Sequence, residues 1–189
     1  MVIGIKLCDT EQELFCSSKW WGDPDLPADM EYPTLDEYPL TFVCQIDCED
    51  IARFDPEGLL PHQGMFYVFA ALDQYVGYDA PYENGPGEWP KKHVVVKYTK
   101  AINFETFQSA IQVDENDEPL TEPSLKMTFG DGNTPSRLLP YATEDEVCLM
   151  EIASGTAGIE FPGGMSLQIY YSRADFDAGK WKLVKARLV

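Results

Sequence analysis

The sequence predicts a mainly β fold of the α+β class, with antiparallel sheets and one or two short helices. Short runs along the chain alternate apolar with polar residues and are rich in β-branched and aromatic side chains, which is the pattern of half-buried strands. Between these runs, 14 glycines and 14 prolines supply the turns that many short strands require. Only two stretches have the spacing of a helix.

The strand pattern occurs in both halves of the chain. The expected strands cover residues 2–7, 40–46, 65–72, 93–99, 147–152, 166–172 and 181–189. The shorter helix is expected at 10–15, where Thr10 is an N-cap and Glu13 completes a capping box. The other is expected at 103–111, where apolar residues recur every three or four positions. The acidic run 114–118 predicts a solvated loop and is the best candidate for an internal boundary.

The length of the chain favours a single domain over residues 1–189. A chain of this size can bury about 70% of its unfolded surface, so its core needs no disulfide or metal to hold it. A faint repeat relates Gly64-Met65 to Gly164-Met165, at an offset of 100 residues. This repeat leaves open an arrangement of two related β halves, about 1–113 and 124–189, that share one core.

A charge balance of −18, from 32 acidic and 14 basic residues, argues against nucleic acid as a partner, because an acidic protein repels a polymer of phosphates. The longest basic run is Lys91-Lys92. The apolar runs are far shorter than the roughly 20 residues that span a bilayer, so no membrane association is expected. The first residues lack the basic leader and the cleavage site of a secretion signal, which predicts a cytoplasmic protein.

The cysteines and histidines favour structural roles. Five cysteines without a C-x-x-C pair indicate reduced thiols in a cytosol, not a disulfide framework. Cys44 and Cys48, separated by three residues, form a candidate soft-metal pair, but His62 and His93 are the only histidines that might complete a site. Buried thiols are the favoured interpretation. The acidic run 114–118 lacks the glycine and glutamate spacing of a calcium loop. We therefore expect no metal and no cofactor.

Familiar catalytic patterns are missing from the sequence. His62 lies in a predicted turn and His93 at the start of a predicted strand, and neither is near a nucleophile elbow, so triad chemistry is not expected. The glycine-rich stretch 129–133 has no following lysine and contains Asp131, which repels phosphate. A tight turn is therefore expected there instead of a nucleotide site. The sequence leaves catalysis open and favours a non-enzymatic function.

The preferred hypothesis is a binding or protein-interaction domain with an acidic, aromatic-rich face. Its candidate residues are Trp20, Trp21, Asp23, Tyr75, Tyr78, Tyr82 and Trp89. Neighbouring side chains of an extended chain point to opposite sides, so one of the two adjacent indoles is expected in the core and the other near the surface. Prolines stiffen the segment 20–27. The alternative to a recognition role is that this segment is a structural cap over a sheet edge. Neither the partner nor the oligomeric state can be read from the sequence.

A hydrolase is the alternative function. Asp73, Asp79 and Glu83 lie among tyrosines, and a pair of carboxylates beside aromatic rings suits hydrolysis of a carbohydrate or polyol. A deep cleft with two carboxyl groups about 5 to 9 Å apart would favour this alternative. A shallow acidic and aromatic patch would favour protein recognition.

Several motifs, in their order and spacing, resemble the YwqG-like family of uncharacterised bacterial proteins. The motifs are Ser18-Lys19-Trp20-Trp21-Gly22-Asp23-Pro24-Asp25-Leu26-Pro27, Glu31-Tyr32-Pro33, Pro39-Leu40-Thr41-Phe42-Val43-Cys44-Gln45-Ile46-Asp47, Leu59-Leu60-Pro61 and Gly64-Met65-Phe66-Tyr67-Val68-Phe69, with a looser match near 164–176. The resemblance implies a compact cytosolic domain rich in β structure and no established reaction. The middle departs from the family, because 129–135 stands where a histidine-containing segment is usual.

Overall fold

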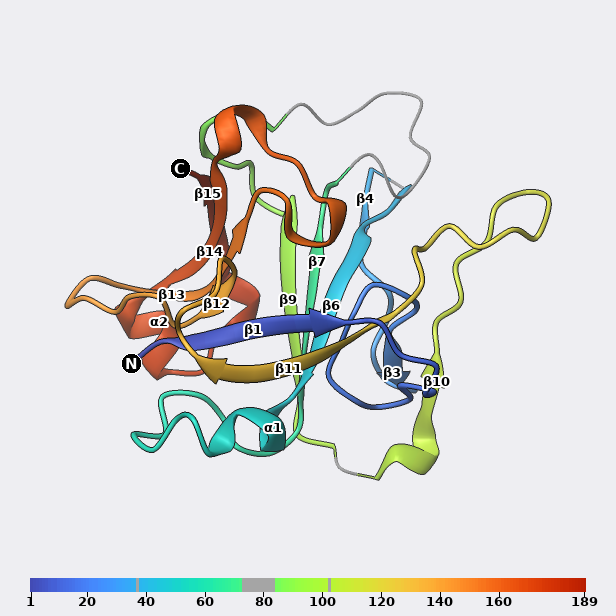
Figure 1. The fold of residues 1–189 in the computed structure, drawn as a ribbon, viewed down its shortest axis with the longest axis horizontal. Coiled ribbons are helices and arrows are strands. Elements are labelled where there is room, and N and C mark those ends of the chain that lie inside the picture. The colour runs from blue at the N-terminus through green and yellow to red at the C-terminus, as the bar shows by residue number, and fades with distance from the viewer. Residues whose placement is uncertain (37, 73–83, 102) are drawn as a thin grey trace.

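Strands make up most of the regular structure in the computed structural model, which describes residues 1–36, 38–72, 84–101 and 103–189 (Figure 1). The strands are β1 (Ile3–Cys8), β2 (Lys19–Trp20), β3 (Asp25–Pro27), β4 (Thr34–Leu35), β5 (Tyr38–Pro39), β6 (Thr41–Asp47), β7 (Met65–Ala70), β8 (Gly87–Glu88), β9 (Val94–Thr99), β10 (Phe107–Ser109), β11 (Leu125–Asp131), β12 (Arg137–Leu138), β13 (Glu146–Ala153), β14 (Ser166–Ser172) and β15 (Lys185–Leu188). The helices are α1 (Cys48–Ala52) and α2 (Arg173–Asp177), with short 3-10 helices at η2 (Phe104–Thr106), η3 (Thr156–Gly158), η4 (Pro162–Gly164) and η5 (Trp181–Leu183). The predicted mainly β fold is confirmed.

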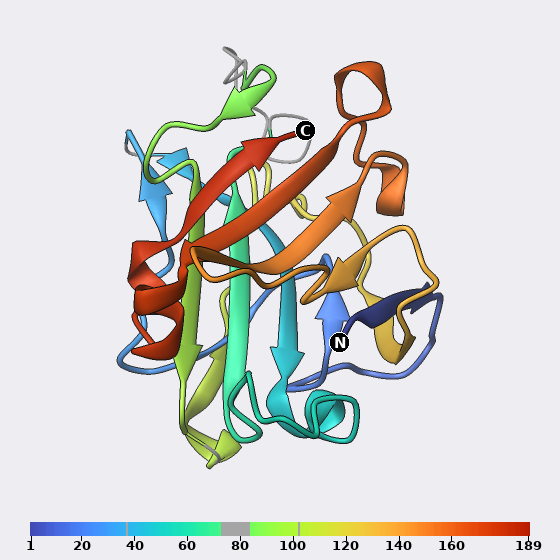
Figure 2. The same ribbon diagram turned by 90° about the vertical axis from the view of Figure 1, so that its left-hand side faces the viewer.

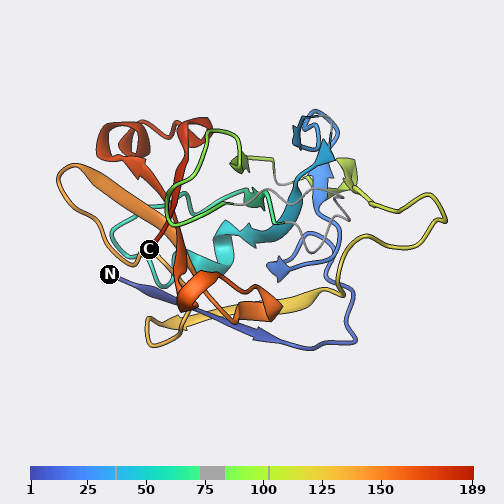
Figure 3. The same ribbon diagram turned by 90° about the horizontal axis from the view of Figure 1, so that it is seen from above.

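One antiparallel sheet forms the frame of the molecule. It has 11 strands in the order β8-β15-β14-β13-β12-β1-β11-β2-β6-β7-β9, and two small sheets pair β10 with β3 and β4 with β5. The large sheet curls, so that β1 and β11 run across β6, β7 and β9 (Figure 1). Seen from above, β1 (dark blue) and β11 (yellow) lie on one side of the molecule (Figure 3). The main core fills the space inside the curl, where Ile3, Ile5 and Met127 belong to the same buried cluster as Phe66 and Val68.

The strands follow the same chain order on both sides of the central β1–β11 pair. On one side lie β2, β6, β7 and β9, and on the other β12, β13, β14 and β15, with β8 added beyond β15. The hairpins β6–β7 and β13–β14 each contain a register shift beside a cysteine, at Cys44 and at Cys148. The origin of this arrangement in two related halves stays a prediction from the sequence.

The strand β7 is buried on both faces. Its side chains alternate between two buried clusters, as the pleat of a strand requires. Phe66, Val68 and Ala70 join the main core, whereas Met65, Tyr67 and Phe69 join a second cluster with Leu26, Leu40 and Phe107. The second cluster packs the small β3–β10 sheet against the outer face of the large sheet. Two layers of packing therefore fix the position of β7 and of its neighbour β9.

A buried carboxylate links these two layers. Asp25 is fully buried, and its Oδ2 lies 2.8 Å from the Nζ of Lys19, whose side chain is only 6% exposed. The backbone N–H of Cys16 and the Nε2 of Gln45 donate to the same oxygen, each at 2.8 Å. Ser109 on β10 donates its hydroxyl to Oδ1 at 2.6 Å. A buried charge is tolerated only when it is paired and hydrogen-bonded, and Asp25 satisfies both conditions.

The two predicted helices are wrong. Residues 103–111 form η2 and then β10, which pairs with β3. Phe107 is buried, whereas Ile111 is 67% exposed, so the apolar spacing does not mark one buried face. Pairing with β3 satisfies the backbone groups that a helix would have satisfied internally. Residues 10–15 form bends and turns.

The sequence pattern does not predict α1 and α2, which begin directly after the long strands β6 and β14. Asp47 accepts a hydrogen bond from the backbone N–H of Glu49 at 3.0 Å, and Ser172 accepts one from Asp175 at 3.2 Å. Aspartate and serine are strong N-cap residues, because their side chains satisfy N–H groups that have no partner within the helix. Each helix is five residues long, which is too short to display an apolar period.

The glycine-rich stretch 129–133 contains the end of β11, not only a turn. Phe129 is buried, and the strand continues to Asp131. A Cβ atom at Gly132 would lie 2.6 Å from Cγ1 of Val2, so the glycine permits close packing here. Strand 181–189 is also shorter than predicted, because residues 181–183 form η5.

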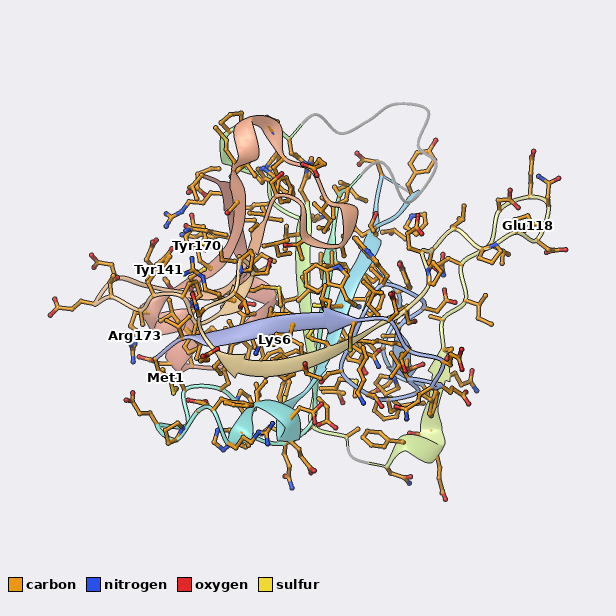
Figure 4. All side chains as sticks on the ribbon, viewed as in Figure 1. Met1, Lys6, Glu118, Tyr141, Tyr170 and Arg173 are labelled. Carbon is orange, nitrogen blue, oxygen red and sulfur yellow. The ribbon has the colours of Figure 1, made fainter. Side chains whose placement is uncertain are left out.

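The acidic run 114–118 forms the tip of the connection between β10 and β11. This connection extends away from the rest of the fold (Figure 1), and Glu118 lies at its end (Figure 4). Most of its side chains are exposed, so the predicted solvated loop is confirmed. None of the helices in the described ranges is long and apolar enough to span a membrane.

We predict that Asp25→Ala lowers the free energy of unfolding by about 3–5 kcal/mol, because it leaves Lys19 buried without its partner. Urea denaturation followed by circular dichroism measures this loss. The matched control is Asp177→Ala, which removes an exposed ion pair with Arg173 and should cost less than about 1 kcal/mol. Equal losses in the two variants would contradict the structural role assigned to Asp25.

Candidate functional site

The adjacent indoles of Trp20 and Trp21 are both buried, the latter with 3% of its surface exposed. The expectation that one of them lies near the surface is therefore wrong. Trp21 has a φ of 59° and Gly22 a φ of 74°, so the chain turns here and does not stay extended. The two rings pack edge to face with centroids 5.9 Å apart, and the Nε1 of Trp21 donates to the carbonyl of Ala157 at 3.0 Å. These rings hold β2 in the core and offer no exposed aromatic face.

The other predicted binding residues are separated or lie outside the described ranges. Asp23 is half-buried, and its Oδ1 accepts a hydrogen bond from the backbone of Gln112 at 3.0 Å. Burial raises the pKa of Asp23 above its ordinary value. Trp89 is 8% exposed and packs against Phe161, and its buried Nε1 has no hydrogen-bond partner among the described residues. Outside the described residues lie Tyr75, Tyr78 and Tyr82, and also the hydrolase candidates Asp73, Asp79 and Glu83.

A cavity of about 1650 Å³ lies along β9, the last strand of the large sheet. All six residues of β9 line it. Its other walls are residues 29–31, residues 179–186, which include η5, and residues 88–92, which connect β8 to β9. We call this cavity the edge groove. Figure 2 shows the molecule from the side on which β15 (red) and β9 (lime green) are both visible.

The edge groove concentrates the positive charge of an acidic protein. Six of the 14 basic residues line it, against four of the 32 acidic residues. The lysines are Lys91, Lys92, Lys97, Lys180, Lys182 and Lys185, and the acids are Asp29, Glu31, Glu88 and Asp175. The groove therefore has a formal balance of six minus four, or +2, whereas the whole chain has −18.

Most of these lysines form no ion pair with another described residue. Lys97 donates to the backbone carbonyl of Glu31, and Lys180 lies 3.3 Å from a carboxylate oxygen of Asp175. Burial lowers the pKa of Lys97. The other four, which are Lys91, Lys92, Lys182 and Lys185, are exposed and form no ion pair with any residue of the described ranges. Their charges are available to a ligand.

The walls of the edge groove are held by aromatic packing. Trp181 in η5 lies edge to face against Phe66 on β7, with ring centroids 4.9 Å apart, and against Phe176 of α2 at 5.4 Å. The hydroxyl of Tyr171 donates to the backbone carbonyl of Trp181 at 3.0 Å. These contacts attach η5 to both ends of the curled sheet. The lysines of the groove therefore project from a fixed frame.

A network of paired charges borders the edge groove on β14 and β15. Tyr170 donates to both carboxylate oxygens of Glu88, at 2.5 and 2.6 Å, and the guanidinium of Arg187 lies 4.4 Å above the ring of Tyr170. Burial and the adjacent Glu88 raise the pKa of Tyr170 to about 12. Arg187 also donates to Glu146 at 2.6 Å and to Tyr141 at 2.5 Å, near Tyr170 in Figure 4. Glu146 is paired with the guanidinium of Arg187, whereas Glu88 accepts from a neutral hydroxyl and keeps its charge.

The cysteines and histidines lie outside this site. Cys44 and Cys48 are fully buried, and burial raises the pKa of both thiols, that of Cys48 to about 12. His62 lies 3.3 Å from the buried carboxylate of Asp55, and His93 lies 2.7 Å from the side-chain oxygen of Asn84. Within the described part of the chain, no group of three cysteine, histidine or acidic residues is placed to hold a metal ion.

Sequence reasoning missed the lysines of the edge groove. Two patterns carried a signal, Lys91-Lys92 followed by Lys97, and Lys180 followed by Lys182 and Lys185. Each begins just before a predicted strand and continues into it, but neither is a long basic run. That the two patterns face one cavity follows only from the curl of the sheet, which brings together residues almost 90 positions apart.

Comparison with protein families finds a match over most of the chain. Residues 18–175, which are most of the chain, match the family model described as "Domain of unknown function (DUF1963)". Comparison with curated proteins finds no match.

We predict that the stabilising effect of Glu146 depends on pH. Its hydrogen bond from Arg187 holds its pKa below the ordinary value, so the ionised carboxylate stabilises the fold at neutral pH and this contribution is lost as pH falls through the lowered pKa. Glu146→Gln should therefore be less stable than the wild type at about pH 7, and this difference should shrink as pH falls toward about pH 3. Urea denaturation at both pH values measures the difference. Glu115→Gln, on the exposed loop, is the control, and a pH-independent loss in Glu146→Gln would contradict the assignment.

Proposed function

The chain belongs to the DUF1963 family of domains of unknown function, and from that premise we propose that it is a binding domain whose edge groove takes an anionic ligand. The observation that carries the proposal is the group of four exposed lysines without ion pairs among the described residues, gathered in one groove of a protein with a charge of −18. The YwqG-like affiliation within this family is part of the same proposal and rests on the motifs between residues 18 and 73.

Electrostatics supports an anionic ligand. Like charges that are held close together repel and destabilise the free protein, and a bound anion removes that repulsion. A cleft lined by one sign of charge also focuses the field and raises the local concentration of the opposite charge. At physiological ionic strength this attraction acts over about 8 Å, which confines it to the groove. The acidic remainder of the surface repels anions that do not enter.

Two of the four carboxylates of the groove are engaged in hydrogen bonds, which supports binding in preference to catalysis. Glu88 accepts the hydroxyl of Tyr170, and Asp175 accepts hydrogen bonds from Ser172 and Lys180. A general acid or base needs a carboxylate that can exchange a proton with substrate. The hydrolase alternative depends on Asp73, Asp79 or Glu83, outside the described residues, and stays a prediction.

The proposed contact surface differs from the expected aromatic face, although Trp89 belongs to both. Because the tryptophans of the original candidate set are buried, the proposed contact surface is the lysine-lined edge groove. A protein partner and a cytoplasmic location remain part of the proposal. All five cysteines lie in the described ranges as free thiols, four of them buried, which supports a reducing compartment.

Lysines beside the free edge of the last strand of a sheet also hinder edge-to-edge aggregation. This role and ligand binding make different predictions. If the lysines only protect the edge of β9, their removal promotes aggregation and leaves the affinity for anions unchanged. If they bind a ligand, their removal weakens that affinity in the soluble monomer.

We predict that poly-L-glutamate raises the unfolding temperature of the protein at low salt, because a ligand at 100 times its Kd stabilises the folded state by about 2.7 kcal/mol. Differential scanning fluorimetry measures the shift, with inorganic polyphosphate as a second anion. The shift should disappear in Lys91→Gln/Lys182→Gln/Lys185→Gln and persist in Lys6→Gln/Lys100→Gln/Lys126→Gln, which changes the net charge equally outside the groove.

Three results would count against this function. One is the lack of a shift with either anion. Another is an equal shift in the two triple variants, which would indicate attraction to the protein as a whole. The third is aggregation of the groove variant with unchanged anion binding in its soluble fraction. That result would indicate that the lysines only protect the edge of β9.

A further inference from the structure

We infer that the ligand of the edge groove is an extended, acidic segment of a polypeptide, with apolar residues between its acidic ones. This inference rests on the proposed function and names the class of ligand.

The size of the groove indicates an elongated ligand. Its volume of about 1650 Å³ exceeds the roughly 300–1,000 Å³ of a typical small-molecule pocket. All six residues of β9 line it, and six residues of strand extend about 20 Å. A ligand that fills this length is a chain of about six residues in extended conformation.

The lysines are distributed along the groove. Lys92 lies in the turn that precedes β9, and Lys97 is the fourth residue of the strand, about 10 Å of extended chain from its first residue. Lys182 in η5 and Lys185 at the start of β15 lie on the opposite wall. One small anion cannot reach charges this far apart. An extended peptide can, because alternate side chains recur on one face about every 7 Å.

Apolar side chains lie between these charges. Met30, Val95, Leu183 and Val184 line the groove, and Leu183 is 50% exposed. Ligand sites combine such apolar surface with a few polar groups that set orientation. A ligand that carries only charge would leave this surface in contact with water. A segment that alternates acidic and apolar residues covers both kinds of wall.

The ligand is held by side chains and does not extend the sheet. Strand addition requires an edge with exposed N–H and C=O groups. Val94 and Val96, in the first half of β9, are almost fully buried.

The same contacts favour a polypeptide over a phosphate polymer. Asp29, Glu31 and Glu88 line the groove beside the lysines, and they repel a ligand with a charge on every unit. A peptide has neutral units between its charges, and its N–H groups can donate to these carboxylates. A nucleic acid also extends beyond the groove, where the surface of a protein with a charge of −18 repels it.

The test is fluorescence anisotropy with labelled peptides of about eight residues, slightly longer than the groove. The first peptide alternates glutamate with leucine or alanine, the second has glutamine in place of glutamate, and the third has lysine. We expect the glutamate peptide to bind at least roughly tenfold more tightly than the glutamine peptide at low salt, and the lysine peptide not to bind. Binding should be lost in the triple variant of Lys91, Lys182 and Lys185 and kept in its matched control.

A second variant tests the apolar contacts. Leu183→Ser should weaken binding of the glutamate–leucine peptide severalfold and leave the unfolding shift with poly-L-glutamate unchanged. Because Leu183 is half exposed, this variant should fold. The control is Ile111→Ser, which removes a more exposed apolar side chain on the loop beyond β10. Equal affinities of the two variants for the peptide would overturn the apolar part of the inference.

The outcomes separate the inference from the proposed function. Binding of inorganic polyphosphate or a single-stranded oligonucleotide through the groove lysines, without binding of any peptide, would overturn the inference and leave the function standing. Failure of every anion to bind would overturn both. Binding of the lysine peptide would also contradict both, because it would place the contact on the acidic surface.

Discussion

The large sheet curls until its last strand, β9, and the segment that leads into β15 face each other across one cavity, but the two do not pair. Two features prevent pairing. Trp181 and its aromatic neighbours fill the space between β7 and α2, and the outer edge of β15 already pairs with β8 at Arg187 and Leu188. The edge groove therefore exists because the sheet approaches closure without completing it. Its position, its length and its two lysine-bearing walls all follow from this geometry.

Buried charges in the core have hydrogen-bond partners, whereas most charges in the groove are exposed and form no ion pair with the described residues. Asp25 receives hydrogen bonds from four side-chain or backbone groups, and the buried Asp55 accepts the backbone N–H groups of Leu59 and Leu60 at 3.1 and 2.7 Å. Burial without such partners would be too costly. The lysines of the groove are exposed, so they can remain unpaired at little cost, and their mutual repulsion is available to favour a ligand of opposite charge.

Membership in a family without an assigned activity leaves function to be argued from the site. The tryptophans that attract notice in the sequence serve packing, as Trp21 does through its ring contact with Trp20 and its hydrogen bond to Ala157. The proposed binding role instead depends on residues that no sequence motif singles out, such as Lys182 and Lys185. Their importance lies in their common position on a groove in an otherwise acidic molecule.

The mainly β class and the places of the long strands, such as β7 and β14, can be predicted from the sequence, because alternation of apolar residues and turn-forming glycines and prolines are local properties. The composition also indicated buried thiols at Cys44 and Cys48. Contacts between distant residues are needed to explain why 107–109 form a strand, because β3 supplies its partner, and why both adjacent indoles are buried, because the backbone turns at Trp21. The tertiary structure alone brought the lysines near β9 to those near β15, since the curl of a sheet depends on contacts between residues far apart in the chain.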